Sequence, residues 1–171
     1  MQTPYYLIDK QKLLKNMQKM QQVRQLSGAK LLLALKCFAS WSVFDLMQDY
    51  MAGTPSSSLY EVKLGKEKFA GETHAYSVAW AAAELPEVLE NCDKIIFNSF
   101  NQLASFGEQA KAAGKACGLR VNPGVSSSSF DLADPALPFS RLGETDTAAI
   151  KTILPQISGF MFHNNCENSS L

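Results

Sequence analysis

The sequence predicts an α/β fold built from about six strand–helix units on a parallel sheet. Short apolar runs alternate with amphipathic stretches along the chain, which is the pattern of βα units. The clearest strand is residues 30–35, where Leu31 to Leu35 form a continuous apolar run typical of a strand buried on both faces. Most expected strands end in polar residues, as on the active-site rim of a (β/α)₈ barrel. Six units do not close such a barrel, so we expect an incomplete one: a fragment, or a chain whose partner supplies the remainder.

The other elements follow from apolar spacing and turn signals. Helices are predicted at residues 13–23, 41–50, 59–69, 84–91, 101–113 and 146–154. Strands are predicted at residues 74–79, 94–98, 116–122 and 157–162, and a strand or loop at residues 51–58. We divide the chain into residues 1–28, an N-terminal strand and helix leading into the barrel, and residues 29–171, the partial barrel.

The composition excludes several classes of function. A hydrophobic content of 46% and a charged content of 19% are typical of a soluble globular protein. The net charge of zero argues against nucleic-acid binding, and no apolar run has the length of a membrane span. The N-terminus lacks the succession of basic, apolar and small residues that is typical of a signal peptide. The four cysteines have neither zinc-site spacing nor a disulfide pattern, so we expect reduced thiols, no metal and a cytoplasmic location.

Lys36 is the strongest candidate for chemistry. It lies at the end of the predicted apolar strand, where its side chain can extend into the cleft above the sheet. An apolar neighbourhood disfavours the charged form of a lysine and frees a nucleophilic amine, which can condense with the aldehyde of a cofactor. The alternative is an ordinary lysine at the end of a strand, whose amine extends into solvent.

Four segments together carry a family resemblance. They are Ala34-Leu35-Lys36-Cys37-Phe38-Ala39, the run from Ser56 to Gly65, the run from Gly118 to Gly124 with Ser140-Arg141-Leu142-Gly143, and the run from Gly159 to Asn168. They resemble the fold-type III pyridoxal-phosphate enzymes, which include alanine racemase and the ornithine and diaminopimelate decarboxylases. The Phe-His-Asn-Asn-Cys-Glu-Asn run at residues 162–168 more specifically resembles the carboxynorspermidine/carboxyspermidine decarboxylases of polyamine synthesis.

The resemblance implies roles for individual residues. Lys36 would hold pyridoxal 5'-phosphate through its amine, and His163 would stack on the pyridine ring rather than serve as a structural histidine. Arg120 would face the ring hydroxyl or order the site; the alternative is a structural arginine in a salt bridge. The polar substrate channel would be lined by three residues, whose alternative is a solvated loop: Asn164, Asn165 and Glu167.

Three further polar residues receive lesser roles. Glu61, one turn into its helix, is expected to order the rim of the site rather than react. His74 has no motif around it and is expected to be structural. Arg141 is expected to make a local contact beyond the serine-rich loop.

The implied function is decarboxylation of carboxynorspermidine or carboxyspermidine to norspermidine or spermidine, by a homodimer with its active site at the interface. The likeness stops at about half the usual length of such enzymes, before the phosphate-binding loop, the acidic partner of the ring nitrogen and the C-terminal β-domain. We therefore expect residues 1–171 alone to be inactive. The alternatives are a decarboxylase of the diaminopimelate or ornithine type, a non-catalytic barrel that binds pyridoxal phosphate, and a truncated product without chemistry.

Overall fold

The computed structural model describes residues 3–128, 131 and 134–163. Its centre is one sheet of five parallel strands, whose order in space is the order in the sequence. The strands are β1 (Gly53–Ser56), β2 (Glu72–Tyr76), β3 (Lys94–Phe97), β4 (Ala116–Arg120) and β5 (Gly159–Met161). A sheet that grows by one parallel neighbour at a time is the arrangement of a (β/α) barrel, so the predicted fold class is confirmed.

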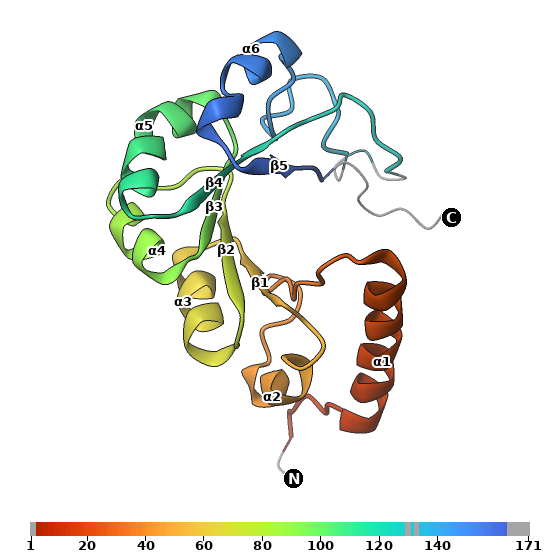
Figure 1. Ribbon diagram of the computed structural model, residues 1–171. Helices are drawn as coiled ribbons and strands as arrows, with labels where there is room; N and C mark the ends of the chain where they lie inside the picture. Colours follow the sequence, from red (N-terminus) through yellow and green to blue (C-terminus); the bar gives the residue numbers. More distant parts are fainter. Residues whose placement is uncertain (1–2, 129–130, 132–133, 164–171) are drawn as a thin grey trace.

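Helices cover the convex side of this curved sheet (Figure 1). The helical elements are α1 (Lys10–Ser27), η1 (Trp41–Val43), α2 (Phe44–Met47), α3 (Leu59–Lys68), α4 (Leu85–Asn91), α5 (Phe100–Ala112), α6 (Thr147–Thr152) and η3 (Leu154–Gln156). Two of them start directly after a strand because a serine caps them: the hydroxyl of Ser58 accepts from the backbone nitrogen of Glu61, and that of Ser99 from the backbone nitrogen of Gln102. These caps place the ends of β1 and β3 beside helix N-termini.

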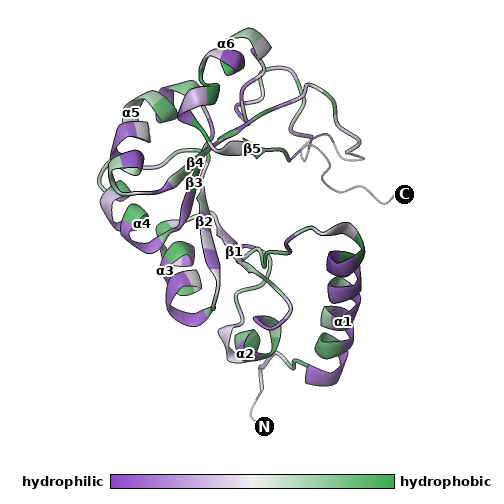
Figure 2. Ribbon diagram, in the orientation of Figure 1, coloured by the Kyte–Doolittle hydropathy of each residue, from purple (hydrophilic) through white to green (hydrophobic). Residues whose placement is uncertain are grey.

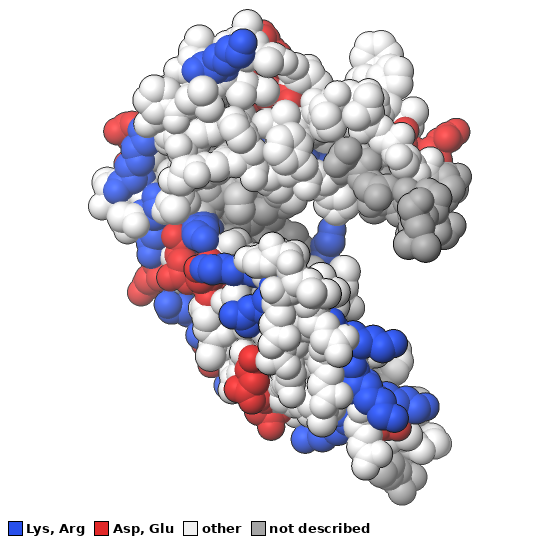
Figure 3. Space-filling model, turned by 45° about the vertical axis from the view of Figure 1, so that its right-hand side comes forward, with Lys and Arg blue, Asp and Glu red and all other residues white. Residues whose placement is uncertain are grey.

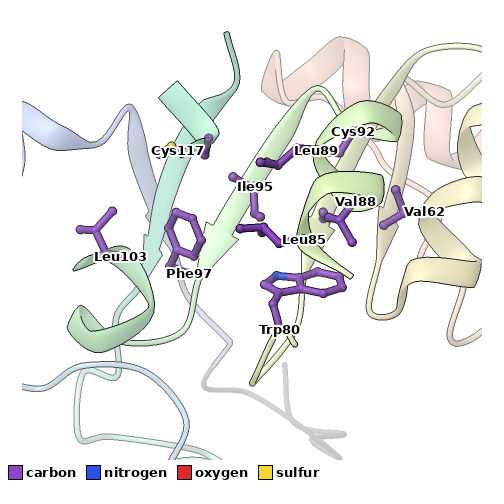
Figure 4. Packing of buried hydrophobic residues seen from close by; sticks show 12 residues of the cluster. Val62, Trp80, Leu85, Val88, Leu89, Cys92, Ile95, Phe97, Leu103 and Cys117 are labelled. Atoms are coloured by element: carbon purple, nitrogen blue, oxygen red, sulfur yellow. The ribbon is translucent and has the colours of Figure 1, made fainter. Parts of the chain in front are cut away.

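The convex face of the sheet forms the main core. Alternate residues of the strands point outward and are fully buried under α3, α4 and α5, among them Ile95 and Phe97 on β3. Figure 4 shows Ile95 beside Leu85 and Leu89 of α4, and Phe97 between Leu85 and Leu103 of α5. In Figure 2 the covering helices carry both hydrophobic and hydrophilic residues, as amphipathic helices do when one side packs on a sheet. The concave face carries the other set, which mixes apolar residues such as Pro55 and Ile96 with polar ones such as His74 and Arg120.

The predicted strand at residues 30–35 is wrong as a regular strand, although the segment does run parallel to β1. The backbone nitrogens of Leu33 and Leu35 donate to the carbonyls of Gly53 (2.9 Å) and Pro55 (3.2 Å), but only one bridge forms, between Leu32 and Gly53. The next bond of the ladder would come from the backbone nitrogen of residue 55, and proline has no N–H to donate. The segment therefore lies beside β1 as an irregular neighbour, and the sheet has five strands among the described residues.

The N-terminal region also differs from the prediction. Residues 3–9 belong to no helix or strand, so the expected N-terminal strand is not present there. Helix α1 is longer than predicted because Asp9 caps its start, accepting from the backbone nitrogens of Gln11 and Lys12, and Gly28 ends it with a φ of +70°. No described helix combines the length and the apolar character that crossing a bilayer requires. The proposed division at residue 28 stays a prediction.

Candidate active site

The concave face of the sheet encloses a cavity of about 950 Å³. Lys36, Arg120 and His163 all line it, although they lie far apart in the sequence. Each lies at the carboxyl end of a parallel segment. Lys36 follows the segment beside β1, Arg120 is the last residue of β4, and His163 follows β5. Because the strands are parallel, their carboxyl ends meet at one edge, which is where barrel enzymes place their reactive groups.

Lys36 occupies a turn rather than an apolar niche. Leu33 and Leu35 are buried, but the chain turns at residues 35–37, where the backbone nitrogens of Cys37 and Phe38 both donate to the carbonyl of Ala34. The side chain of Lys36 is exposed at the cavity. The desolvation expected from the sequence is therefore not present in this structure, because the turn carries Lys36 away from the buried leucines. The amine is instead accessible to a ligand in the cavity.

Arg120 is a buried cation at the end of β4. Its side chain is 4% exposed; Nη1 donates to the hydroxyl of Tyr76 and Nη2 to the backbone carbonyl of His163 (3.3 Å). The guanidinium carbon lies 5.4 Å from the centre of the Tyr76 ring, a cation–π contact. No carboxylate within the described part of the chain forms an ion pair with Arg120 or Lys36, so the expected alternative of a salt-bridged Arg120 finds no support there. A buried cation without a carboxylate favours an anionic ligand.

His163 lies half-buried at the same edge. Burial lowers its pKa below the ordinary value, and the positive charges of Lys36 and Arg120 lower that pKa further. The imidazole of His163 is consequently neutral at neutral pH and offers an uncharged ring face. The three side chains also line the same cavity.

Two residues of this site were missed by the sequence analysis. Tyr76, at the end of β2, and Asn98, directly after β3, link Arg120 to the loop that follows β4. The side-chain oxygen of Asn98 accepts from the Tyr76 hydroxyl (3.0 Å) and from the backbone nitrogen of Gly143 (3.1 Å), while its nitrogen donates to the carbonyl of Arg141 (2.8 Å). Their place at strand ends was a usable signal, but nothing in the sequence pairs them with Arg120.

Two further residues with predicted roles, Glu61 and Arg141, lie at this edge of the sheet. Glu61 accepts from the backbone nitrogen (2.7 Å) and hydroxyl (2.9 Å) of Ser57, which lines the cavity, so Glu61 does order the rim. The backbone carbonyl of Arg141 accepts from the side chain of Asn98, and the role of the Arg141 side chain stays a prediction. The predicted substrate-binding residues lie outside the described residues: Asn164, Asn165 and Glu167.

The opposite, amino-terminal end of the concave face carries a compact charge cluster. The carboxylate of Glu72 accepts from Lys30 (2.6 Å), from Lys94 (2.7 Å) and from the imidazole of His74 (2.9 Å). These hydrogen bonds, led by the one from Lys30, hold the pKa of Glu72 well below its ordinary value. His74 therefore has the structural role expected for it. Elsewhere acidic and basic side chains lie interspersed on the face shown in Figure 3.

Among the described cysteines, Cys117 borders the cavity, whereas Cys37 and Cys92 do not line it. Cys37, Cys92 and Cys117 are free thiols. Burial raises the pKa of Cys92 to about 11 and also raises the pKa of Cys117. Because the thiolate is the reactive form, both buried thiols are inert at neutral pH.

The fold matches part of the barrel of the alanine racemase-type decarboxylases. A diaminopimelate decarboxylase from Helicobacter pylori shares this fold, with a TM-score of 0.76 at 19% identity, covering 96% of this chain and 45% of that one. Carboxynorspermidine decarboxylase from Campylobacter jejuni, solved in complex with norspermidine, gives a TM-score of 0.84 at 36% identity over 99% of this chain and 43% of that one.

Comparison of the sequence with known proteins indicates a narrower group of relatives than comparison of the fold. No family model matches this sequence. The chain is 68% identical over 166 residues to the carboxynorspermidine/carboxyspermidine decarboxylase of Herminiimonas arsenicoxydans, covering 97% of this chain and 45% of that protein. It is 33% identical to a carboxyaminopropylagmatine decarboxylase of Synechocystis, covering 99% of this chain and 44% of that protein. The resemblance to the N-terminal part of carboxynorspermidine/carboxyspermidine decarboxylases is thus confirmed, and the chain spans a little under half the length of these relatives.

Proposed function

We propose that this chain forms the cofactor-binding, N-terminal part of a pyridoxal-phosphate-dependent decarboxylase acting on carboxynorspermidine or carboxyspermidine. The observation that carries the proposal is the meeting of Lys36, Arg120 and His163 on one cavity, in a chain 68% identical to such a decarboxylase. The proposal includes a cytoplasmic homodimer with the active site at its interface. It concerns the activity of a protein that contains this part, because the relatives are about twice as long.

The described residues fit the cofactor. When bound, pyridoxal phosphate supplies an electron sink for the pair left behind as carbon dioxide departs. The exposed amine of Lys36 can reach an aldehyde carbon in the cavity. Arg120 offers a guanidinium without a described carboxylate partner, which suits an anionic oxygen. The neutral imidazole of His163 offers a flat face against which an aromatic ring stacks without charge repulsion.

The substrate would carry its α-amino acid end toward Lys36 and its cationic amine tail away from it. A cationic tail needs carboxylate or amide oxygens, which we assign to the residues after His163: Asn164, Asn165 and Glu167. Apolar side chains on the cavity wall, including Leu142 and Phe162, suit the methylene segments between the amines. The Campylobacter jejuni relative was solved with norspermidine, which supports a polyamine product for this chain as well.

The first test is release of carbon dioxide by the full-length protein. Carboxynorspermidine and carboxyspermidine should be turned over faster than carboxyaminopropylagmatine and diaminopimelate. Residues 1–171 expressed alone should give no turnover, since they span under half of the relatives' length. Preference for diaminopimelate, or binding of pyridoxal phosphate with no decarboxylation of any of these compounds, would contradict the proposal.

The second test locates the covalent attachment. Adding pyridoxal phosphate should give a yellow absorbance band, and borohydride should fix the cofactor on the peptide that contains Lys36. Lys30 and Lys63 serve as internal controls, because both are already paired with carboxylates, Glu72 and Glu87. Labelling of either control lysine in place of Lys36 would overturn the assignment.

A further inference from the structure

The segment from Arg141 to Glu144 lies against the carboxyl ends of β3 and β4. The backbone nitrogen of Glu144 donates to the carbonyl of Arg120 (3.0 Å), and the backbone nitrogen of Asn122 donates to the carbonyl of Glu144 (2.9 Å). The Glu144 carboxylate also accepts from the backbone nitrogen of Phe100, at the start of α5 (2.8 Å). The segment is therefore anchored to two neighbouring units of the sheet.

Gly143 allows this segment to lie directly on Arg120. Its φ is +86°, a conformation that favours glycine. A Cβ at this position would lie 3.0 Å from Cγ of Arg120 and 3.2 Å from its carbonyl oxygen. The stem of the Arg120 side chain is thus held between the sheet and the segment, and the neighbouring Leu142 faces the cavity.

Asn98 connects the segment to the charged end of Arg120. It is 5% exposed, and its side-chain amide bonds the Arg141 carbonyl, the Gly143 nitrogen and the Tyr76 hydroxyl. The Tyr76 hydroxyl in turn accepts from Nη1 of Arg120. One neutral side chain therefore serves both the segment and, through Tyr76, the guanidinium.

We propose that Tyr76 and Asn98 are positioning residues, which fix the direction of the Arg120 guanidinium toward an anionic ligand and couple it to the docked Arg141–Glu144 segment. The inference rests on the proposed function, in which Arg120 contacts the cofactor. The neutral amide matters: an aspartate at position 98 would face the Arg141 carbonyl without a proton to donate and would bring a negative charge toward Arg120. Asn98 holds the network together while leaving the charge of Arg120 for the ligand.

The experiment compares Tyr76→Phe, Asn98→Ala and Asn98→Asp in the full-length protein. Pyridoxal-phosphate binding is followed by its absorbance band. Each variant should raise the dissociation constant by about tenfold or more. Tyr76→Phe removes a hydrogen bond to the charged guanidinium, Asn98→Ala removes the group that holds the Tyr76 hydroxyl, and Asn98→Asp offsets the charge of Arg120. The matched controls are Tyr60→Phe on the exposed face of α3 and Asn91→Ala, whose amide bonds only its own helix in the described structure. Both controls should bind as the unaltered protein does.

Two readouts need no cofactor. Amide exchange at Gly143 should accelerate at least tenfold in Asn98→Ala, since its acceptor is removed. The rate at which phenylglyoxal modifies Arg120 should rise severalfold in Tyr76→Phe, since the guanidinium loses a partner that helps to hold it in place. Cofactor binding and Arg120 modification that both match the controls would overturn the positioning role. If the unaltered protein binds no pyridoxal phosphate, the proposed function fails, and these two readouts still decide the coupling.

Discussion

The two ends of the concave face both carry cationic side chains, but these differ in whether a carboxylate pairs with them. At the amino end, one carboxylate, Glu72, is bonded by Lys30, Lys94 and His74. At the carboxyl end, the cations Lys36 and Arg120 form no ion pair with any carboxylate of the described chain. At the first end both lysines share a carboxylate partner, whereas at the second neither cation has one, although both ends contribute residues to the same cavity. A cluster of charges therefore indicates a ligand site only where its partners are missing.

The largest expected effect comes from removing the amine of Lys36 at the carboxyl end. Lys36→Ala should abolish covalent attachment of pyridoxal phosphate and lower decarboxylation by at least about 1,000-fold, roughly 4 kcal/mol in activation free energy. Turnover and borohydride trapping in the full-length protein measure both effects. Lys63→Ala is the control, because Lys63 lies on α3, away from the cavity, and pairs with Glu87. Equal losses in the two variants would show that Lys36 has no special role.

The next effect concerns stability at the amino end. Glu72→Gln should lower the free energy of unfolding by about 1–2 kcal/mol, because it weakens three charge-assisted hydrogen bonds whose lysine partners are partly exposed. Glu108→Gln, which removes only an exposed pair with Lys111, should change stability by less than about 0.5 kcal/mol. Urea unfolding checks both values. Cofactor binding should be unchanged in Glu72→Gln. A loss of binding would contradict the assignment of the ligand site to the carboxyl end alone.

The pH dependence of that stability follows from the sign of the shift. The pKa of Glu72 is lower in the folded protein than in the unfolded chain, so the unfolded chain binds the proton more readily. The stabilisation is present above the unfolded value, near 4.3, and is lost as the pH falls through the lower folded value. Unfolding curves of the unaltered protein and Glu72→Gln should therefore begin to approach each other as the pH falls below about 4, and converge only at stronger acid.

The smallest expected effect is the pH dependence of cofactor binding that His163 causes at the carboxyl end. Its pKa is lowered, so the neutral form is favoured and protonation occurs only below the ordinary histidine range, near 6.5. Affinity for pyridoxal phosphate should weaken by about tenfold, roughly 1.4 kcal/mol, as the pH falls below that range, because a charged imidazolium is then stacked against a pyridine ring whose nitrogen is itself protonated in acid. His163→Phe keeps a stacking face without a titrating group. Its binding curve should lack this acid limb, and an identical limb in both proteins would assign the titration elsewhere.

Much of the architecture could be predicted, and the errors have identifiable causes. Caps and apolar periodicity located α3, α5 and their strands to within a few residues. The strand expected at residues 30–35 failed because Pro55 of its neighbour lacks an N–H, and pairing across the sheet is invisible to a window along one segment. The exposed state of Lys36 was missed for a related reason: the turn that follows Leu35 sets its direction.

The sequence by itself determined the parallel βα order, the resemblance to a decarboxylase family, and Lys36, Arg120 and His163 as candidates. These features are local, since they depend on periodicity, capping residues and short motifs. Only the tertiary structure decided which charges are paired and which residues hold Arg120. It also decided that Asn98 joins Tyr76 to Gly143, which lies 45 residues after Asn98 in the chain. The physical reason is that hydrogen bonds and ion pairs act over a few ångströms in space, between residues that only the folded sheet brings together.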